Sequence, residues 1–171
     1  MDKETFSCKI LVFSEQLFRL ANSILLDEET ARDCVQDLYL KLWEKRNSLN
    51  HVENLSAFVM KGIRNLCLDK MRKKRELSIE TNDYELEPER ISLQQVIEQK
   101  DMIKMIKKLI NQLPELQRTI IRLRDVEGFE IKEIAYITAT TENAVTANLS
   151  RARKKIRNEM MSGRGHKILC P

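Results

Sequence analysis

Residues 142–157 place polar and cationic side chains on one face of a predicted helix. At about 100° per residue, this face is small or polar near its start and cationic near its end, with Asn143, Ala147, Ser150, Arg151 and Lys154. Amide and hydroxyl groups can hydrogen-bond to base edges in a major groove, while cations bind the flanking phosphates. This face is therefore suited to binding duplex DNA. Cations near a helix C-terminus can also serve only to stabilise its dipole.

The elements that must position this face form a predicted helix-turn-helix. Val145, Leu149, Ala152 and Ile156 recur at helical spacing and make an apolar stripe opposite the polar face. Upstream, residues 131–137 form a short helix with an apolar side of its own, and Thr140 and Thr141 follow as a turn and N-cap. Two short amphipathic helices in this order favour the DNA interpretation.

A second cationic surface is predicted on a helix spanning residues 55–75. Between residues 61 and 75 there are seven basic groups and Asp69 as the acidic one. The side chains expected to project from it are Lys61, Arg64, Asn65, Leu68, Arg72 and Arg75. Such a stripe suits a nucleic-acid backbone, although solvated basic helices are also common. The preceding loop, residues 49–54, could hold an unstacked base through Leu49, Asn50, His51 and Asn54.

The helix predicted for residues 28–46 has an acidic face. Ala31, Val35, Leu38 and Leu42 form its core stripe. The opposite face carries Asp33, Gln36, Asp37, Leu40 and Glu44. A leucine exposed among carboxylates fits contact with a basic, partly apolar partner helix, but a single exposed leucine often has no such meaning.

Charge is segregated along the 171 residues. Residues 1–75 carry 14 basic and 11 acidic groups, residues 76–101 carry 2 and 8, and residues 102–171 carry 14 and 7. The balances of +3, −6 and +7 predict two modules that each touch a polyanion, joined by a segment that repels it. We expect an all-α chain with domains at 1–76 and 99–161, a flexible acidic linker at 77–98 that contains Pro88, and a disordered tail at 162–171.

Other classes of protein fit the sequence less well. No apolar run approaches the roughly 18 residues of a membrane span, and the N-terminus lacks a signal-peptide pattern, so we expect a cytoplasmic protein. The four cysteines are scattered, and three are expected to be buried free thiols in helices: Cys8, Cys34 and Cys67. We predict no metal and no cofactor, because His51 and His166 have no ligand-like companions. Asp33 and Asp37 lack the third ligand that a metal-dependent nuclease would need.

The whole pattern resembles a bacterial sigma-70 family factor of the small extracytoplasmic-function type. The motifs are VQDLYLKLWEKR, AFVMKGIRNLCLDKMRKKR, an acidic linker, LPELQRTIIRLRDVEGFEIKEIAYI and AVTANLSRARKKIR, which together span most of residues 6–160. The resemblance implies sigma regions 2 and 4, no enzymatic activity, and binding to core RNA polymerase and promoter DNA. It also implies an anti-sigma partner. The alternative, a stand-alone helix-turn-helix regulator, would bind duplex DNA without polymerase.

The resemblance also implies residue roles. The acidic face of residues 33–44 would dock on the beta-prime clamp helices, and the polymerase beta flap would be a second contact. Asn65 would read the minus-ten element, together with the loop at residues 49–54 and the cations of the helix at residues 55–75, which are Lys61, Arg64, Arg72 and Arg75. The minus-thirty-five element would be read by Asn143, Thr146, Ala147, Asn148, Ser150, Arg151, Lys154 and Lys155. Thr146 and Asn148 stand where the family often has cations, which predicts weak promoter affinity for the isolated domain. Ala139 stands where the family often has glycine and fits if its φ is not positive.

Overall fold

The computed structural model describes residues 2–81 and 99–165, and within these ranges the secondary structure is helical. The N-terminal module comprises α1 (Lys3–Ile10), a 3₁₀ turn (Leu11–Phe13), α2 (Ser14–Leu25), α3 (Glu28–Glu44), a second 3₁₀ turn (Ser48–His51) and α4 (Leu55–Thr81). The C-terminal module comprises α5 (Gln99–Asn111), α6 (Glu115–Ile121), a π-helical turn (Arg122–Val126), α7 (Ile131–Thr138) and α8 (Glu142–Gly165). The predicted all-α class is confirmed.

Side-chain caps start α3 and α8, and the one at Thr141 is the cap that the sequence predicts. The Asp27 carboxylate accepts a 2.9 Å hydrogen bond from the Thr30 N–H at the start of α3. The Thr141 hydroxyl accepts one of 3.1 Å from the Ala144 N–H at the start of α8. Each cap satisfies a backbone donor that the first helical turn leaves without a partner. The caps therefore fix where α3 and α8 begin, and with it which of their side chains share an exposed face.

The buried apolar side chains of both modules form one continuous core cluster. In the N-terminal module the fully buried side chains include Ile10, Leu17, Leu20, Ile24, Met60 and Ile63. In the C-terminal module they include Ile120, Leu123, Ile134, Ile137 and Val145. Helices α3 and α4 approach closely at Gly62, where an added Cβ would lie 2.9 Å from Leu38 Cδ1. Burial of these side chains stabilises both helix packings and orients their polar faces outward.

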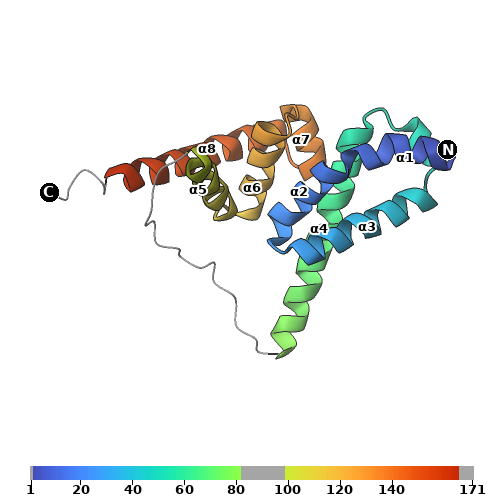
Figure 1. Ribbon diagram of the computed structural model, residues 1–171, viewed down its shortest axis with the longest axis horizontal. Coiled ribbons are helices and arrows are strands. Elements are labelled where there is room, and N and C mark those ends of the chain that lie inside the picture. Colours follow the sequence, from blue (N-terminus) through green and yellow to red (C-terminus); the bar gives the residue numbers. More distant parts are fainter. Residues whose placement is uncertain (1, 82–98, 166–171) are drawn as a thin grey trace.

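The two modules pack against one another. Helix α2 contacts α6, and α4 contacts α7, as Figure 1 shows in the centre of the molecule. The C-terminal half of α4 projects away from the body, and α8 extends in a different direction (Figure 1). The cationic stripe of α4 is therefore divided into a part beside the C-terminal module and a part that leaves it.

Two helices extend past the predicted domain bounds. Helix α4 runs to Thr81, into the predicted linker, and α8 runs to Gly165, into the predicted tail. Both extensions prolong helices already begun, and adding a residue to an existing helix avoids the cost of nucleation. The remainder of the predicted linker (82–98) and tail (166–171) lies outside the described residues.

Candidate nucleic-acid interface

Helix α8 presents the polar face that the sequence predicts. Val145, Leu149 and Ala152 are buried against the C-terminal core, and Ile156 is half-buried. The exposed side chains on the outer surface include Asn143, Ser150, Arg151, Lys154 and Lys155. A helix held by one apolar edge can enter a major groove with its free side, as in other helix-turn-helix proteins.

Three residues of the predicted α8 set are placed differently from the others. Thr146 Oγ1 donates to the Glu142 carbonyl oxygen at 3.0 Å, and Asn148 Nδ2 donates to the Ala144 carbonyl oxygen at 2.8 Å. Ala147 is half-buried. Because Thr146 and Asn148 bond to their own helix, they would have to change rotamer to donate these hydrogens to a base or phosphate.

The helix-turn-helix turn departs from the expectation for Ala139. Its backbone is left-handed, with φ 53° and ψ 43°, and its N–H caps the end of α7 by bonding to the Ala135 and Tyr136 carbonyl oxygens. The short connection between α7 and α8 requires this conformation to reverse the chain. Alanine therefore occupies a position at which glycine would avoid the steric conflict of a Cβ.

The cations of α4 do not all project into solvent. Asn65, Arg72 and Arg75 are exposed, and Arg72 lies 3.3 Å from Asp69. The prediction is wrong for Arg64, which is 8% exposed and lies 3.6 Å from the Glu115 carboxylate. Its Nε is buried without a hydrogen-bond partner. Burial follows from the packing of the C-terminal module against this part of α4, which the helical period alone does not report.

Lys61 belongs to the same covered part of α4. Its Nζ lies 4.0 Å from the centroid of the Tyr136 ring, which belongs to α7. An ammonium group over an aromatic face is attracted by the electron density of the ring. Lys61 is half-buried, so the C-terminal module meets a second cation of the predicted DNA surface.

The loop before α4 has fewer side chains free to bind a base than the sequence predicts. Leu49 is 4% exposed and belongs to the core, so it does not form a wall open to a base. Asn54 caps α4, because its Oδ1 accepts from the Ala57 N–H at 2.9 Å, and its Nδ2 donates to Glu133 at 2.6 Å. Asn50 and His51 are exposed. The four residues are close in sequence, but the fold uses two of them for structure.

The acidic face of α3 is where the sequence places it. Asp33, Gln36, Asp37, Leu40 and Glu44 are all exposed, and the Leu40 side chain is 65% exposed. The Asp37 carboxylate lies 3.8 Å from Lys70 Nζ on α4. This face lies opposite the buried stripe of Ala31, Val35, Leu38 and Leu42, so it is free to meet another molecule.

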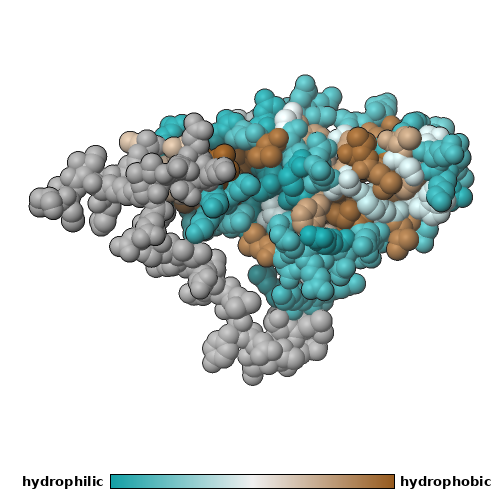
Figure 2. Space-filling model, viewed as in Figure 1, coloured by the Kyte–Doolittle hydropathy of each residue, from teal (hydrophilic) through white to brown (hydrophobic). Residues whose placement is uncertain are grey.

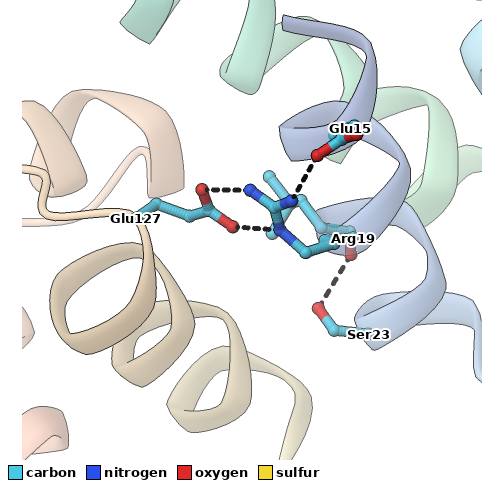
Figure 3. Close-up of polar contacts among 5 residues, drawn as sticks. Glu15, Arg19, Ser23 and Glu127 are labelled. Atoms are coloured by element: carbon cyan, nitrogen blue, oxygen red, sulfur yellow. Dashed lines mark hydrogen bonds and ion pairs between the residues drawn. The ribbon is translucent and has the colours of Figure 1, made fainter.

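A bidentate ion pair joins the two modules, and no pattern in the sequence points to it. Arg19, on α2, donates through Nε and Nη2 to both carboxylate oxygens of Glu127, each at 2.9 Å (Figure 3). The Glu127 side chain is 2% exposed, whereas that of Arg19 is 39% exposed. The hydrogen bond to Glu127 raises the pKa of Arg19. These residues are 108 apart in sequence. Glu127 lies within the motif of residues 113–137, but nothing in that motif identifies Arg19 as its partner.

The buried Arg118 and the half-buried Arg122 accompany this pair. Arg118, on α6, donates to the carbonyl oxygens of Asn111 at 2.7 Å and of Ile24, at the end of α2, at 3.3 Å. Burial lowers the pKa of Arg118 and of Arg122, and the charge of Glu127 opposes this effect at Arg122. Charged groups placed between the modules must therefore satisfy each other rather than bind water.

The predictions for the cysteines are confirmed at two positions and wrong at a third. Cys34 and Cys67 are buried free thiols, and burial raises the pKa of both, but Cys8 is exposed, contrary to expectation. Among the described residues there is no cluster of three or more histidine, cysteine or acidic side chains suited to a metal ion. No helix in the described part of the chain is long and apolar enough to cross a membrane.

A hollow with apolar walls lies on the C-terminal module, where α5, α6 and the π-helical turn meet α8. Its volume is about 450 Å³, and its lining includes Ile106, Ile110, Ile121, Val126, Ile156, Met160 and Met161. Val126 and Met161 are 54% and 63% exposed. Apolar patches interrupt a largely polar surface in the view of Figure 2.

Comparison with known proteins finds two family matches. The model of sigma-70 region 2 matches residues 12–76, and that of sigma-70 region 4 matches residues 103–156. A probable RNA polymerase sigma factor, RfaY, from Xanthomonas campestris is 26% identical over 83% of this chain, which spans 37% of that protein. The ECF RNA polymerase sigma factor SigW of Bacillus subtilis is 21% identical over 93% of this chain and 90% of its own length.

A solved structure is similar over nearly the whole chain. It is the sigma factor RpoE in complex with the anti-sigma factor NepR from Bartonella quintana. The two chains are 26% identical with a TM-score of 0.77, and the match covers 92% of this chain and 98% of that one.

Proposed function

Since this chain belongs to the sigma-70 family, as an RNA polymerase sigma factor of the extracytoplasmic-function type, we propose how its surfaces divide the work of initiation. Helix α8 grips duplex DNA at the minus-thirty-five element. Helix α4 and the loop before it hold the melted strand of the minus-ten element, and α3 binds core polymerase. The observation that carries this assignment is the exposure of three separate surfaces: the acidic face of α3, the cationic face of α8 and the part of α4 that carries Arg72 and Arg75.

The DNA-binding step needs no chemistry beyond hydrogen bonds and ion pairs. Cations of α8 that neutralise phosphates release counterions, and this supplies much of the affinity. At the minus-ten element, capture of an unstacked base offsets part of the unstacking cost, about a few kcal/mol per base. The exposed carboxamide of Asn65 would bind such a base. We propose that the protein acts by binding, without a catalytic step of its own, and that it does so in the cytoplasm, where the chromosome is.

The polymerase contact on α3 is assigned to Leu40 and the carboxylates around it. An exposed leucine within an acidic face can bury apolar surface on a basic partner helix while the carboxylates pair with its cations. The beta-prime clamp helices are the proposed partner. The second polymerase contact, with the beta flap, is assigned to the apolar hollow of the C-terminal module, where Val126 and Met161 are exposed.

An anti-sigma protein is a further proposed partner. The structurally similar RpoE is seen bound to the anti-sigma factor NepR. Faces that bind polymerase are surfaces that such an inhibitor could cover, because covering them would prevent holoenzyme formation.

Run-off transcription tests the proposed function. Purified core polymerase is combined with a library of promoter fragments, with and without the chain, and new transcripts are expected when the chain is present. Leu40→Asp should abolish them and should prevent co-elution with core polymerase. Val12→Asp is the matched control, since Val12 is 69% exposed on a different part of the N-terminal module. Transcription that is insensitive to Leu40→Asp would exclude the α3 contact.

A further inference from the structure

Two buried cysteines face each other between α3 and α4. Cys34, on α3, and Cys67, on α4, are both 0% exposed, and their thiols are in hydrogen-bond contact. They are far apart in sequence and meet because the two helices pack together. The surfaces assigned above to polymerase and DNA use neither sulfur. Two thiols in contact are placed so that a disulfide can form without unfolding the chain.

A partly exposed ion pair lies near the two thiols. Lys70 Nζ, on α4, lies 3.8 Å from the Asp37 carboxylate, on α3, and their side chains are 36% and 51% exposed. The charge of Lys70 lowers the pKa of both thiols, although burial raises the pKa of each by more. A nearby cation favours the thiolate, which is the form that reacts with oxidants.

We propose that Cys34 and Cys67 are a redox modification site, which hydrogen peroxide converts to a disulfide between α3 and α4. The Cys34 sulfur attacks a peroxide oxygen, and the products are a sulfenic acid and one water. The Cys67 sulfur then attacks the Cys34 sulfur, the sulfur–sulfur bond forms, and the hydroxyl leaves as a second water. In total two thiols lose two electrons and two protons, and one hydrogen peroxide becomes two waters.

Burial sets the order and the rate of these steps. It raises the pKa of Cys67 far above its usual range, so Cys34 is assigned as the attacking thiol. Since both thiols stay largely protonated, the pair should react more slowly than the exposed Cys8. The site therefore stays reduced in an ordinary cytoplasm and responds to sustained peroxide.

The disulfide would disturb the acidic face of α3. Cys34 lies in α3 between Asp33 and Asp37, two residues of that face. The new bond draws α3 and α4 together at this level, but Leu38 already lies against Gly62, where an added Cβ would be 2.9 Å from its Cδ1. Helix α3 must therefore turn or tilt, and its acidic face moves with it. Oxidation should weaken binding to core polymerase, a consequence that rests on the proposed function of α3.

The first measurement locates the disulfide in the full chain without polymerase. The chain is treated with hydrogen peroxide, the remaining thiols are alkylated in denaturant, and the peptides are mapped by mass spectrometry. We expect a peptide pair joined through Cys34 and Cys67 that forms more slowly than Cys8 is oxidised. The control combines Cys8→Ala with Cys170→Ala, which leaves only the buried pair. If no peptide pair joined through Cys34 and Cys67 forms in this control, the proposal is wrong.

The second measurement is affinity for core polymerase, added after the peroxide has been removed. The oxidised chain should bind about 5-fold or more weakly than the reduced chain, the lower end of usual coupling between sites, and dithiothreitol should restore binding. Cys67→Ala cannot form the bond, so its affinity should not respond to peroxide. Cys34→Ala replaces it if that variant does not fold.

The outcomes separate this proposal from the proposed function. A mapped disulfide without any change in affinity would refute the effect on α3, and weakening that persists in Cys67→Ala would assign it to another group. If the disulfide forms but the reduced chain does not bind core polymerase, the proposed function fails and the modification site remains.

Discussion

Ala139 provides a direct test of the backbone geometry at the helix-turn-helix. Its φ of 53° places the Cβ too close to the following carbonyl oxygen, which costs about 1–2 kcal/mol in a non-glycine residue. Ala139→Gly removes this conflict, but the greater freedom of glycine in the unfolded chain offsets about 0.4–1 kcal/mol. The substitution should therefore raise the free energy of unfolding by about 0.5–1 kcal/mol.

Urea denaturation followed by circular dichroism measures the change, and a thermal scan should show a midpoint higher by about 1–4 °C for a chain of this size. The side chain at position 139 is exposed, so its removal leaves no cavity. Ala144→Gly is the matched control, because Ala144 lies within α8, where glycine should lower stability by about 0.5–1 kcal/mol.

A stability of Ala139→Gly equal to or below that of the parent would refute the assignment of a strained turn. Loss of stability at both positions would mean that residue 139 has ordinary helical geometry in solution. Since the turn keeps the same path in either variant, duplex binding by α8 should be unchanged by Ala139→Gly.

The remaining predictions concern the DNA surfaces and a helix cap. Asn65→Ala should impair transcription from a duplex promoter more than from a pre-melted template; an equal loss on both would contradict base capture. Arg151→Ala should reduce the slope of log affinity against log salt by about 0.9 for each lost phosphate contact, measured by anisotropy on duplex DNA, and an unchanged slope would exclude that contact. The bond from the Thr30 N–H lowers the pKa of Asp27 from 3.8. A carboxylate with a lowered folded-state pKa stabilises the fold above its unfolded pKa and stops doing so as the pH falls through the folded value. The stability advantage of the parent over Asp27→Asn in urea denaturation should therefore be present at pH 7, decline once the pH falls below about 4, and be lost as the pH falls through the lowered folded-state pKa; an advantage that persists in stronger acid would argue against it.

Local chemistry made much of the fold predictable. The stripe of Val145, Leu149 and Ala152 predicts which side of α8 is buried. Side chains three or four residues apart lie on the same side of a helix, and apolar side chains are buried together away from water. Asp27 and Thr141 cap helices because their oxygens lie next to unpaired backbone donors. The exposed acidic face of α3 follows from the same periodicity.

Predictions failed where a residue's surroundings come from a distant part of the chain. Arg64 has the spacing of an exposed cation, yet the packing of α6 and α7 buries it beside Glu115. Asn54 resembles a free loop amide, but it both caps α4 and bonds to Glu133. At Ala139, where the family often has glycine, the alanine favoured an ordinary φ, but the positive φ depends on how α7 and α8 must meet.

The amino-acid sequence by itself determined the helices, their buried sides, the two-module charge pattern and the family resemblance, since each depends on neighbours within a few turns. Only the tertiary structure decided which cations of α4 face water and which face carboxylates of the other module. The physical reason is that Arg19 and Glu127, 108 residues apart, gain their interaction only when the two modules meet, and no local periodicity encodes that meeting.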